Sequence, residues 1–257
     1  MRTIRTVAFL SLLTFLPMIS SAQYDVYKEF DDFVVCGYQK EQYNDNSIGL
    51  DYLSQAISKT GECRTGDIIE KGRGVAICGD NGYSNSLSTT IDAKLIKALS
   101  KNQKTGKRFT DITFNSKGQY VIILNGTEYD EHKIPNGFKK RLEECVSEGD
   151  TIYSVSLDDY NNWAYVTDKH YGASSTADFN FMKKASEELG GIVSVCIAPH
   201  GIVVCCNKGV CFNNVPKSVA DALVEFVELG SIPRVVKFTD SGTYLITDGK
   251  SIFSYWM

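Results

Sequence analysis

A short apolar segment recurs along this chain, and nearly every copy begins at a turn signal. The six copies start at residues 32, 74, 118, 162, 201 and 242, and the copy at 118–122 reads Gly-Gln-Tyr-Val-Ile. Successive copies are separated by 42, 44, 44, 39 and 41 residues. So regular a period predicts one supersecondary unit repeated six times, and not a series of unrelated domains.

The clearest unit covers residues 91–132. Apolar residues at 91, 95, 98 and 99 fall on one face of a helix. Three short strand patterns follow, separated by turns at 115–118 and 125–126, where Gly118 is expected to need a positive φ. Two tight turns per unit indicate an antiparallel meander and not a βαβ unit. The predicted strands are 109–114, 120–124 and 127–131.

The same plan continues to the C-terminus, and the first unit begins directly with strand patterns at 24–30, 33–36 and 39–43. Pro135 and Pro216 stand at predicted helix starts, where a missing N–H costs nothing. The fold class is therefore mainly β with α: six three-stranded antiparallel meanders joined by five helices, in one repeat domain over 23–257. The predicted units are about 24–47, 48–88, 89–132, 133–175, 176–213 and 214–257.

Six small antiparallel sheets, each with edges to protect, resemble the blades of a six-bladed β-propeller, with a helix where the outermost strand of a blade usually lies. This resemblance implies that the units close as a ring, so that the group at 24–43 contacts the group at 235–255. An open α+β solenoid and a tandem of small PepSY-like domains are the alternatives.

The N-terminus has the pattern of a secretory signal peptide over residues 1–22. Arg2 and Arg5 precede an apolar run from Val7 to Ile19, and Ser20-Ser21-Ala22 offers a cleavage site. The Ser-Ala-Gln ending resembles signal peptides of Gram-negative bacteria. We therefore expect an exported protein, periplasmic or extracellular, with no integral membrane segment after cleavage.

Charge argues against a nucleic-acid partner. The chain has 27 Lys and Arg against 31 Asp and Glu, and loss of the two signal-peptide arginines leaves 25 against 31. Binding to nucleic acid relies on clustered positive charge, and this sequence has no Lys/Arg block.

Three of the eight cysteines fall in one column of the repeat. Cys36, Cys78 and Cys205 occupy a position that other units fill with Ile or Val, which predicts buried packing sites. Cys206 follows on the opposite face of its strand. A disulfide from Cys206 to Cys211 across the turn at 207–209 is predicted, with Cys196 as an alternative partner.

The three histidines give little sign of catalysis. His132 and His170 are both expected to follow a third strand in successive units and so to lie on the same rim. A shared metal site with Asp130, Glu131 and Asp168 is therefore one alternative to solvated loop residues, which we favour. His200 with Cys205 or Cys206 would make a nucleophile pair, but no family signature surrounds them. We expect no catalytic residues, no metal and no cofactor.

Aromatic residues are the remaining candidates for function. Amphipathic rings at the edges of small sheets suit a face that binds protein or glycan. The predicted function is therefore an exported, non-catalytic repeat scaffold that binds a protein or saccharide, and the alternative is a hydrolase with a site assembled from loops on one rim. The candidate binding residues are Tyr38, Tyr43, Tyr83, Tyr129, Tyr171, Phe212 and Tyr255.

Overall fold

The computed structural model describes residues 24–30, 33–40, 62–70, 73–87, 90, 92–249 and 252–255; for 24–40 and 252–255 it describes the course of the strands only. The predicted signal peptide, the strand residues 41–43 and the predicted first helix near Leu50 lie outside these residues.

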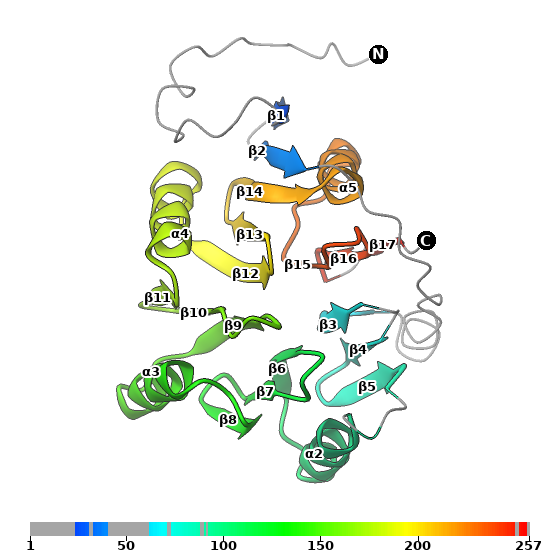
Figure 1. Cartoon of the computed structure of the whole chain (residues 1–257), viewed down its shortest axis with the longest axis vertical. Coiled ribbons are helices and arrows are strands. Elements are labelled where there is room, and N and C mark those ends of the chain that lie inside the picture. Colours follow the sequence, from blue (N-terminus) through cyan, green and yellow to red (C-terminus); the bar gives the residue numbers. More distant parts are fainter. Residues whose placement is uncertain are drawn as a thin grey trace.

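The described chain is mainly β, and most of it forms antiparallel meanders of three strands. Five such meanders follow one another, and we call the strand that opens each one its first strand (Figure 1). In order they are β3 (Thr65–Ile69), β4 (Arg73–Cys78) and β5 (Gly82–Asn85); β6 (Phe109–Phe114), β7 (Tyr120–Leu124) and β8 (Glu128–His132); β9 (Ile152–Leu157), β10 (Trp163–Thr167) and β11 (Tyr171–Ala173); β12 (Ile192–Ala198), β13 (Gly201–Cys206) and β14 (Gly209–Pro216); β15 (Val235–Phe238), β16 (Tyr244–Thr247) and β17 (Ile252–Tyr255).

Helices connect these meanders, as the repeat predicts. Within the described ranges they are α2 (Ala93–Lys104), α3 (Asn136–Ser147), α4 (Thr176–Leu189) and α5 (Lys217–Glu228). Each turns an apolar face to the sheets; in α5, Val219, Leu223 and Phe226 are at most 1% exposed. Pro135 and Pro216 directly precede α3 and α5, confirming both predicted helix starts. None of these four helices is long and apolar enough to cross a membrane.

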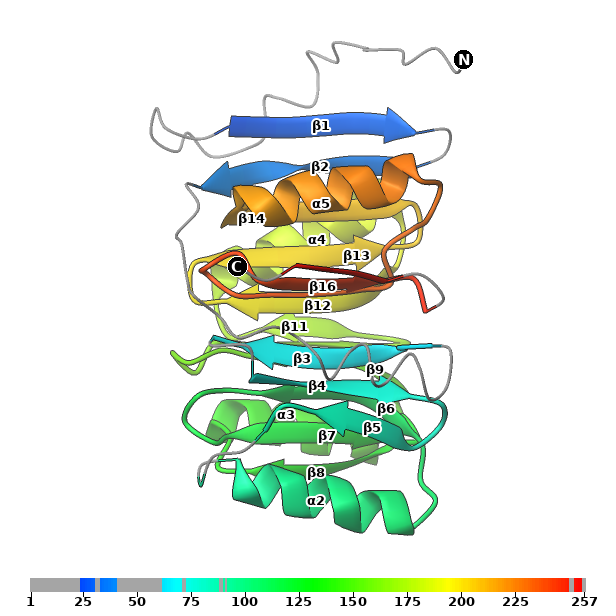
Figure 2. The same cartoon turned by 90° about the vertical axis from the view of Figure 1, so that its right-hand side faces the viewer.

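The N-terminal group differs from the prediction. Strands β1 (Tyr24–Phe30) and β2 (Phe33–Lys40) form a hairpin, and β2 pairs in parallel with β14 (Figure 2). Together they make one five-stranded sheet in the order β1-β2-β14-β13-β12. In the described residues the N-terminal group is thus not a sixth separate sheet. The reason is that β14 offers an edge with unpaired backbone groups, which β2 satisfies.

The last meander also has a different neighbour from the one predicted. The strands β15 and β16 contact β3, whereas the N-terminal hairpin lies against β14 and α5 (Figure 1). Each first strand contacts the next along the chain, from β3 through β6, β9 and β12 to β15. The first strands of all five meanders therefore meet at the centre of the molecule.

Side chains link these first strands where no backbone ladder does. Asp67 Oδ2 accepts a hydrogen bond from the Phe114 amide at 2.8 Å, and Asp111 Oδ2 accepts one from the Val155 amide at 2.8 Å. Ser156 Oγ accepts from the Ile197 amide, also at 2.8 Å. These polar residues satisfy edge-strand amides that would otherwise be buried without partners.

Candidate functional site

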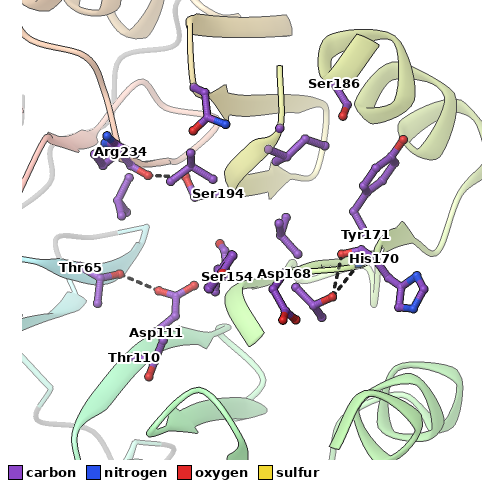
Figure 3. Close-up of a pocket in the computed structure, with 18 of the residues that line it drawn as sticks. Thr65, Thr110, Asp111, Ser154, Asp168, His170, Tyr171, Ser186, Ser194 and Arg234 are labelled. Atoms are coloured by element: carbon purple, nitrogen blue, oxygen red, sulfur yellow. Dashed lines mark hydrogen bonds between the residues drawn. The ribbon is translucent and has the colours of Figure 1, made fainter. Parts of the chain in front are cut away.

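A pocket of about 660 Å³ opens where the first strands begin, and we call it the strand-start pocket (Figure 3). From the centre it extends outward between the third and fourth meanders. Its outer part is lined by the segment 166–171, by Ser186 of α4, by 191–193 and by Asn207. Its central part is lined by Thr65, Asp111, Ser154, Ser194 and Arg234.

The central wall is held by short hydrogen bonds between meanders. Thr65 Oγ1 donates to Asp111 Oδ1 at 2.6 Å, and Ser194 Oγ donates to the Arg234 carbonyl at 2.6 Å (Figure 3). Ser154 Oγ accepts from the Val195 amide at 3.3 Å. Since each bond joins two different units, the shape of this wall depends on the packing of the whole centre.

A buried charged group lies behind this wall. Lys237 is 1% exposed; its Nζ donates to the Val155 carbonyl at 3.1 Å and lies 3.8 Å from Asp111 Oδ2. Burial acts to lower the pKa of Lys237, but Asp111 and then Asp67 outweigh it, so this pKa lies above its ordinary value. Burial raises the pKa of Asp67 to about 6. Lys237 therefore neutralises Asp111, while Asp67 stays protonated in mild acid.

Two arginines line the pocket. Arg64 is held by main-chain carbonyls: its Nε donates to Gly79 at 2.6 Å, and its Nη2 donates to Phe109 at 2.7 Å and to Asp80 at 3.3 Å. Arg234 is exposed. Among the described residues, neither guanidinium makes an ion pair.

Several polar side chains of the pocket are not used by the fold. Within the described part of the chain, the side chains of Thr110, Tyr153, Ser186 and Asn207 make no hydrogen bond. Tyr153 is 45% exposed, and the half-buried Tyr171 packs at 5.9 Å from the Phe179 ring. The pocket thus combines two tyrosine rings with donors and acceptors that remain available to a ligand.

At the outer part of the pocket, His170 of the lining converges with two acids that lie outside the lining. His170 Nε2 lies 3.8 Å from both Glu148 Oε2 and Asp150 Oδ2, and this is the single group of potential metal ligands among the described residues. Lys169 Nζ lies 2.7 Å from Asp150 Oδ1, and this bond is the main cause of the lowered pKa of Asp150. The ammonium of Lys169 therefore already supplies, at Asp150, the positive charge that a metal ion would bring.

The structure does not form the shared metal site considered for His132 and His170. His132 ends β8, whereas His170 precedes β11, so the two lie at opposite ends of equivalent third strands. Near His132, Asp130 accepts a hydrogen bond from Asn102 and Glu131 pairs with Lys139.

The predicted disulfide is not formed: Cys206 and Cys211 are both buried thiols that are not joined by an S–S bond. In the strand pair, Cys206 lies opposite Gly209, and Cys211 lies opposite Val204. The two thiols are thus diagonal neighbours, whose Cα atoms are about 7–8 Å apart, too far for a disulfide. Cys196 is no substitute partner, because it packs in a different core cluster from Cys206.

A Cys–His nucleophile pair is not assembled either. His200 lies in the turn between β12 and β13, is 60% exposed and pairs with Asp240. Cys205 and Cys206 are at the far end of β13 and are buried. Burial raises the pKa of Cys205 to about 12, which keeps its thiol protonated at neutral pH.

The candidate aromatic residues do not gather in one place. Tyr83, Tyr129, Tyr171 and Phe212 pack in four different core clusters, and Phe212 is fully buried. Of these four, only Tyr171 lines the strand-start pocket. Tyr38 and Tyr255 are placed in β2 and β17, with no side-chain description, and Tyr43 lies outside the described residues.

The central pocket residues were missed by the sequence analysis, although a signal for them exists. Polar residues stand at alternate positions of otherwise apolar first strands, as in Thr65-Gly-Asp67 and Ser154-Val-Ser156. Such alternation marks one polar face of a strand. Because a polar strand face ordinarily meets solvent, the pattern by itself does not reveal that this face turns to the centre.

Comparison of the chain with protein-family models and with curated proteins found no match. The strand-start pocket is the feature from which a function can be argued.

Proposed function

We propose that this chain is an exported binding protein that holds a saccharide in the strand-start pocket. The observation that carries this proposal is the pocket itself, with its volume of about 660 Å³ and its lining of tyrosines and uncommitted polar groups. Ligand sites in proteins usually have volumes of roughly 300–1,000 Å³. The elongated course from the centre outward between two meanders suits a short chain of sugars.

The lining chemistry suits a saccharide. A tyrosine ring offers an apolar face that packs on the C–H face of a sugar and a hydroxyl that reaches water or ligand. Tyr153 and Tyr171 supply such rings, and Thr110, Ser186 and Asn207 supply hydroxyl and amide groups for sugar hydroxyls. Backbone and side-chain bonds fix the central wall in advance, which reduces the ordering cost of binding.

The architecture proposed with this function is a closed ring of five meanders, similar to a propeller, with the N-terminal hairpin added to one of them. Two side-chain hydrogen bonds between the last and the first meander support closure. Thr247 Oγ1 donates to the Cys63 carbonyl at 3.0 Å, and Ser241 Oγ donates to Glu70 Oε2 at 2.7 Å. An open solenoid or a row of tandem domains would separate these units. In a closed ring, the pocket would be the mouth of the central axis.

Binding is favoured over the hydrolase alternative by the state of the reactive groups. Burial raises the pKa of Cys63 and Cys196 to about 12 and that of Cys145 to about 11, so these thiols are poor nucleophiles. His170 already lies beside Asp150, which Lys169 neutralises.

Calorimetry with neutral and acidic oligosaccharides, preceded by a glycan array, tests the proposal on residues 23–257. We expect Tyr153→Ala to weaken binding about tenfold, because a packed ring contributes up to about 1.5 kcal/mol beyond its buried area. Tyr160→Ala is the matched control, since Tyr160 is 66% exposed and lies outside the pocket lining. Equal affinity of wild type and Tyr153→Ala, or no saccharide bound on either platform, would contradict the proposal. Capture of a protein ligand alone would also count against it.

A further inference from the structure

The strand-start pocket contains positive charge that the fold does not neutralise. Arg64 and Arg234 both line it, and neither forms an ion pair with a described residue. We infer, resting on the saccharide proposal above, that the ligand is an acidic saccharide of the uronic-acid class, and that these two arginines bind its carboxylates.

Arg64 has the properties of a prepared anion-binding group. Neutral carbonyls hold its Nε and Nη2, which fixes the plane of the guanidinium without removing its charge. Its Nη1 makes no hydrogen bond with the described residues. Burial first, and the charge of Arg108 second, lower the pKa of Arg64, and the opposing charges of Glu62 and Asp80 only partly offset them. A partly buried cation whose charge is not fully compensated is stabilised by an incoming anion.

Arg234 offers a second cation from a fixed point of the main chain. Its amide donates to the Thr247 carbonyl at 2.8 Å, and its carbonyl accepts from Ser194 Oγ at 2.6 Å. The backbone is therefore held on both sides, and the exposed side chain of this lining residue forms no ion pair with a described residue. Planar guanidinium groups bind carboxylates through paired, charge-assisted hydrogen bonds.

The other charged groups of the pocket do not neutralise the positive charges of Arg64 and Arg234. Asp111 is compensated by Lys237 from behind the wall, and Lys169 is compensated by Asp150. Asp168 remains, and its Oδ1 accepts a hydrogen bond from the Thr151 amide at 2.8 Å. Two arginines against one carboxylate leave the pocket with an excess of positive charge.

Calorimetry with an oligomer of galacturonic acid and a neutral galactose oligomer of equal length tests this inference. We expect the acidic oligomer to bind at least tenfold more tightly, and its affinity to fall as NaCl is raised from about 20 to 500 mM, because salt screens exposed charges. A sulfated galactose oligomer distinguishes carboxylate recognition from attraction to any negative charge.

Variants of Arg64 and Arg234 test whether these two residues cause the preference for the acidic oligomer. Arg234→Gln should reduce the preference for the acidic oligomer at least fivefold, and Arg64→Lys should weaken carboxylate binding although it keeps the charge. Arg141→Gln is the control, because Arg141 is an exposed residue of α3 outside the pocket. Thermal unfolding of each variant checks that the fold is intact.

The outcomes separate the two proposals. If neutral and acidic oligomers bind equally, or if Arg234→Gln leaves the preference unchanged, the acidic-ligand inference falls and the saccharide function stands. Equal binding of the sulfated and carboxylated oligomers would overturn the assignment to carboxylates. If neither oligomer binds, or only acidic peptides do, both proposals fall.

Discussion

At the scale of single residues, the centre of the molecule is governed by the imbalance between one ammonium and two carboxylates. Lys237, Asp67 and Asp111 are each at most 6% exposed. One buried ammonium faces two buried carboxylates, and burial disfavours the charged form of Asp67, which keeps its proton in mild acid. Burial is the main reason why the pKa of Asp67 rises to about 6 although Lys237 is near and its oxygens accept two backbone amide hydrogen bonds, and the charge of Asp111 adds a smaller rise.

Asp67 should therefore make stability depend on pH in mild acid. Its pKa is about 6 in the folded state against an ordinary value of 3.8. Between these values the unfolded chain loses the proton and the folded chain keeps it, so the free energy of unfolding should fall as pH rises from about 4 to 6. The expected loss is on the order of 1–3 kcal/mol, and it should be constant above the folded pKa. Urea unfolding at several pH values measures it.

The variant Asp67→Asn should remove this component, since an amide does not titrate. The control is Asp221→Asn on α5, where Asp221 is exposed and pairs with Lys217. Wild type and Asp67→Asn with the same pH dependence between 4 and 6 would show that Asp67 is not the group responsible.

Some residue-level features were predictable because their cause is local. Gly118 has a φ of 76°, and the turn at 125–126 has φ values of 55° and 77°, which confirms the predicted turns. The column of Cys78 and Cys205 is buried, also as predicted. The roles of Lys237 and Arg64 were not predictable, because their partners are distant in sequence. Lys237 donates to carbonyls of β6 and β9, and Arg64 donates to the Phe109 carbonyl of β6.

At the scale of elements, periodicity located the meanders and helices, but not the partner of the N-terminal hairpin. A two-residue alternation or a 3.6-residue stripe is visible within one segment, whereas the pairing of β2 with β14 joins distant segments. By pattern alone, the third strand of any meander would be an equally good partner for β2 if its edge were open. The predicted sixth sheet thus became an extension of an existing one.

Removal of the hairpin should expose the edge of β14. A chain that begins at residue 41 loses the backbone bonds between β2 and β14 and the cover that β1 and β2 give to α5. We expect stability to fall by several kcal/mol, at roughly 0.5–1.5 kcal/mol for each net hydrogen bond lost. Because an open edge strand pairs with other chains, dimers or larger species should also form.

Size-exclusion chromatography and denaturant unfolding measure both effects, with a chain that begins at residue 23 as the control. A truncated chain that stays monomeric and unfolds like the control would show that the hairpin is not part of the folded unit.

At the scale of the whole molecule, the contact between the last and the first meander decides whether the units unfold together. Leu245 of β16 is fully buried, and it packs with Cys63, Ile68, Ala76 and Cys78 of the first meander. This cluster joins segments that are far apart in the sequence. In a closed ring, a substitution in this cluster should lower the stability of all units together.

Leu245→Ala should accordingly lower the free energy of unfolding by about 2–5 kcal/mol, because it removes a buried side chain and leaves a cavity. We expect a single cooperative transition in both calorimetry and circular dichroism, shifted to lower temperature. Leu229→Ala is the control, since Leu229 is 68% exposed and its truncation should change stability by less than about 0.5 kcal/mol. A separate early transition of the last meander alone would contradict closure.

The parallel pairing of β2 with β14 has a consequence for the time course of folding. Val34 lies opposite Gly209, so the N-terminal hairpin reaches its place only after a loop of about 175 residues has closed. Contacts of such high sequence separation slow folding, since the entropy of closure is lost before the contact is gained. During synthesis, the strands that emerge first must wait until four meanders have followed them. The hairpin is therefore expected to dock last and to be the part of the chain that is exposed longest to proteases and to other unfolded chains.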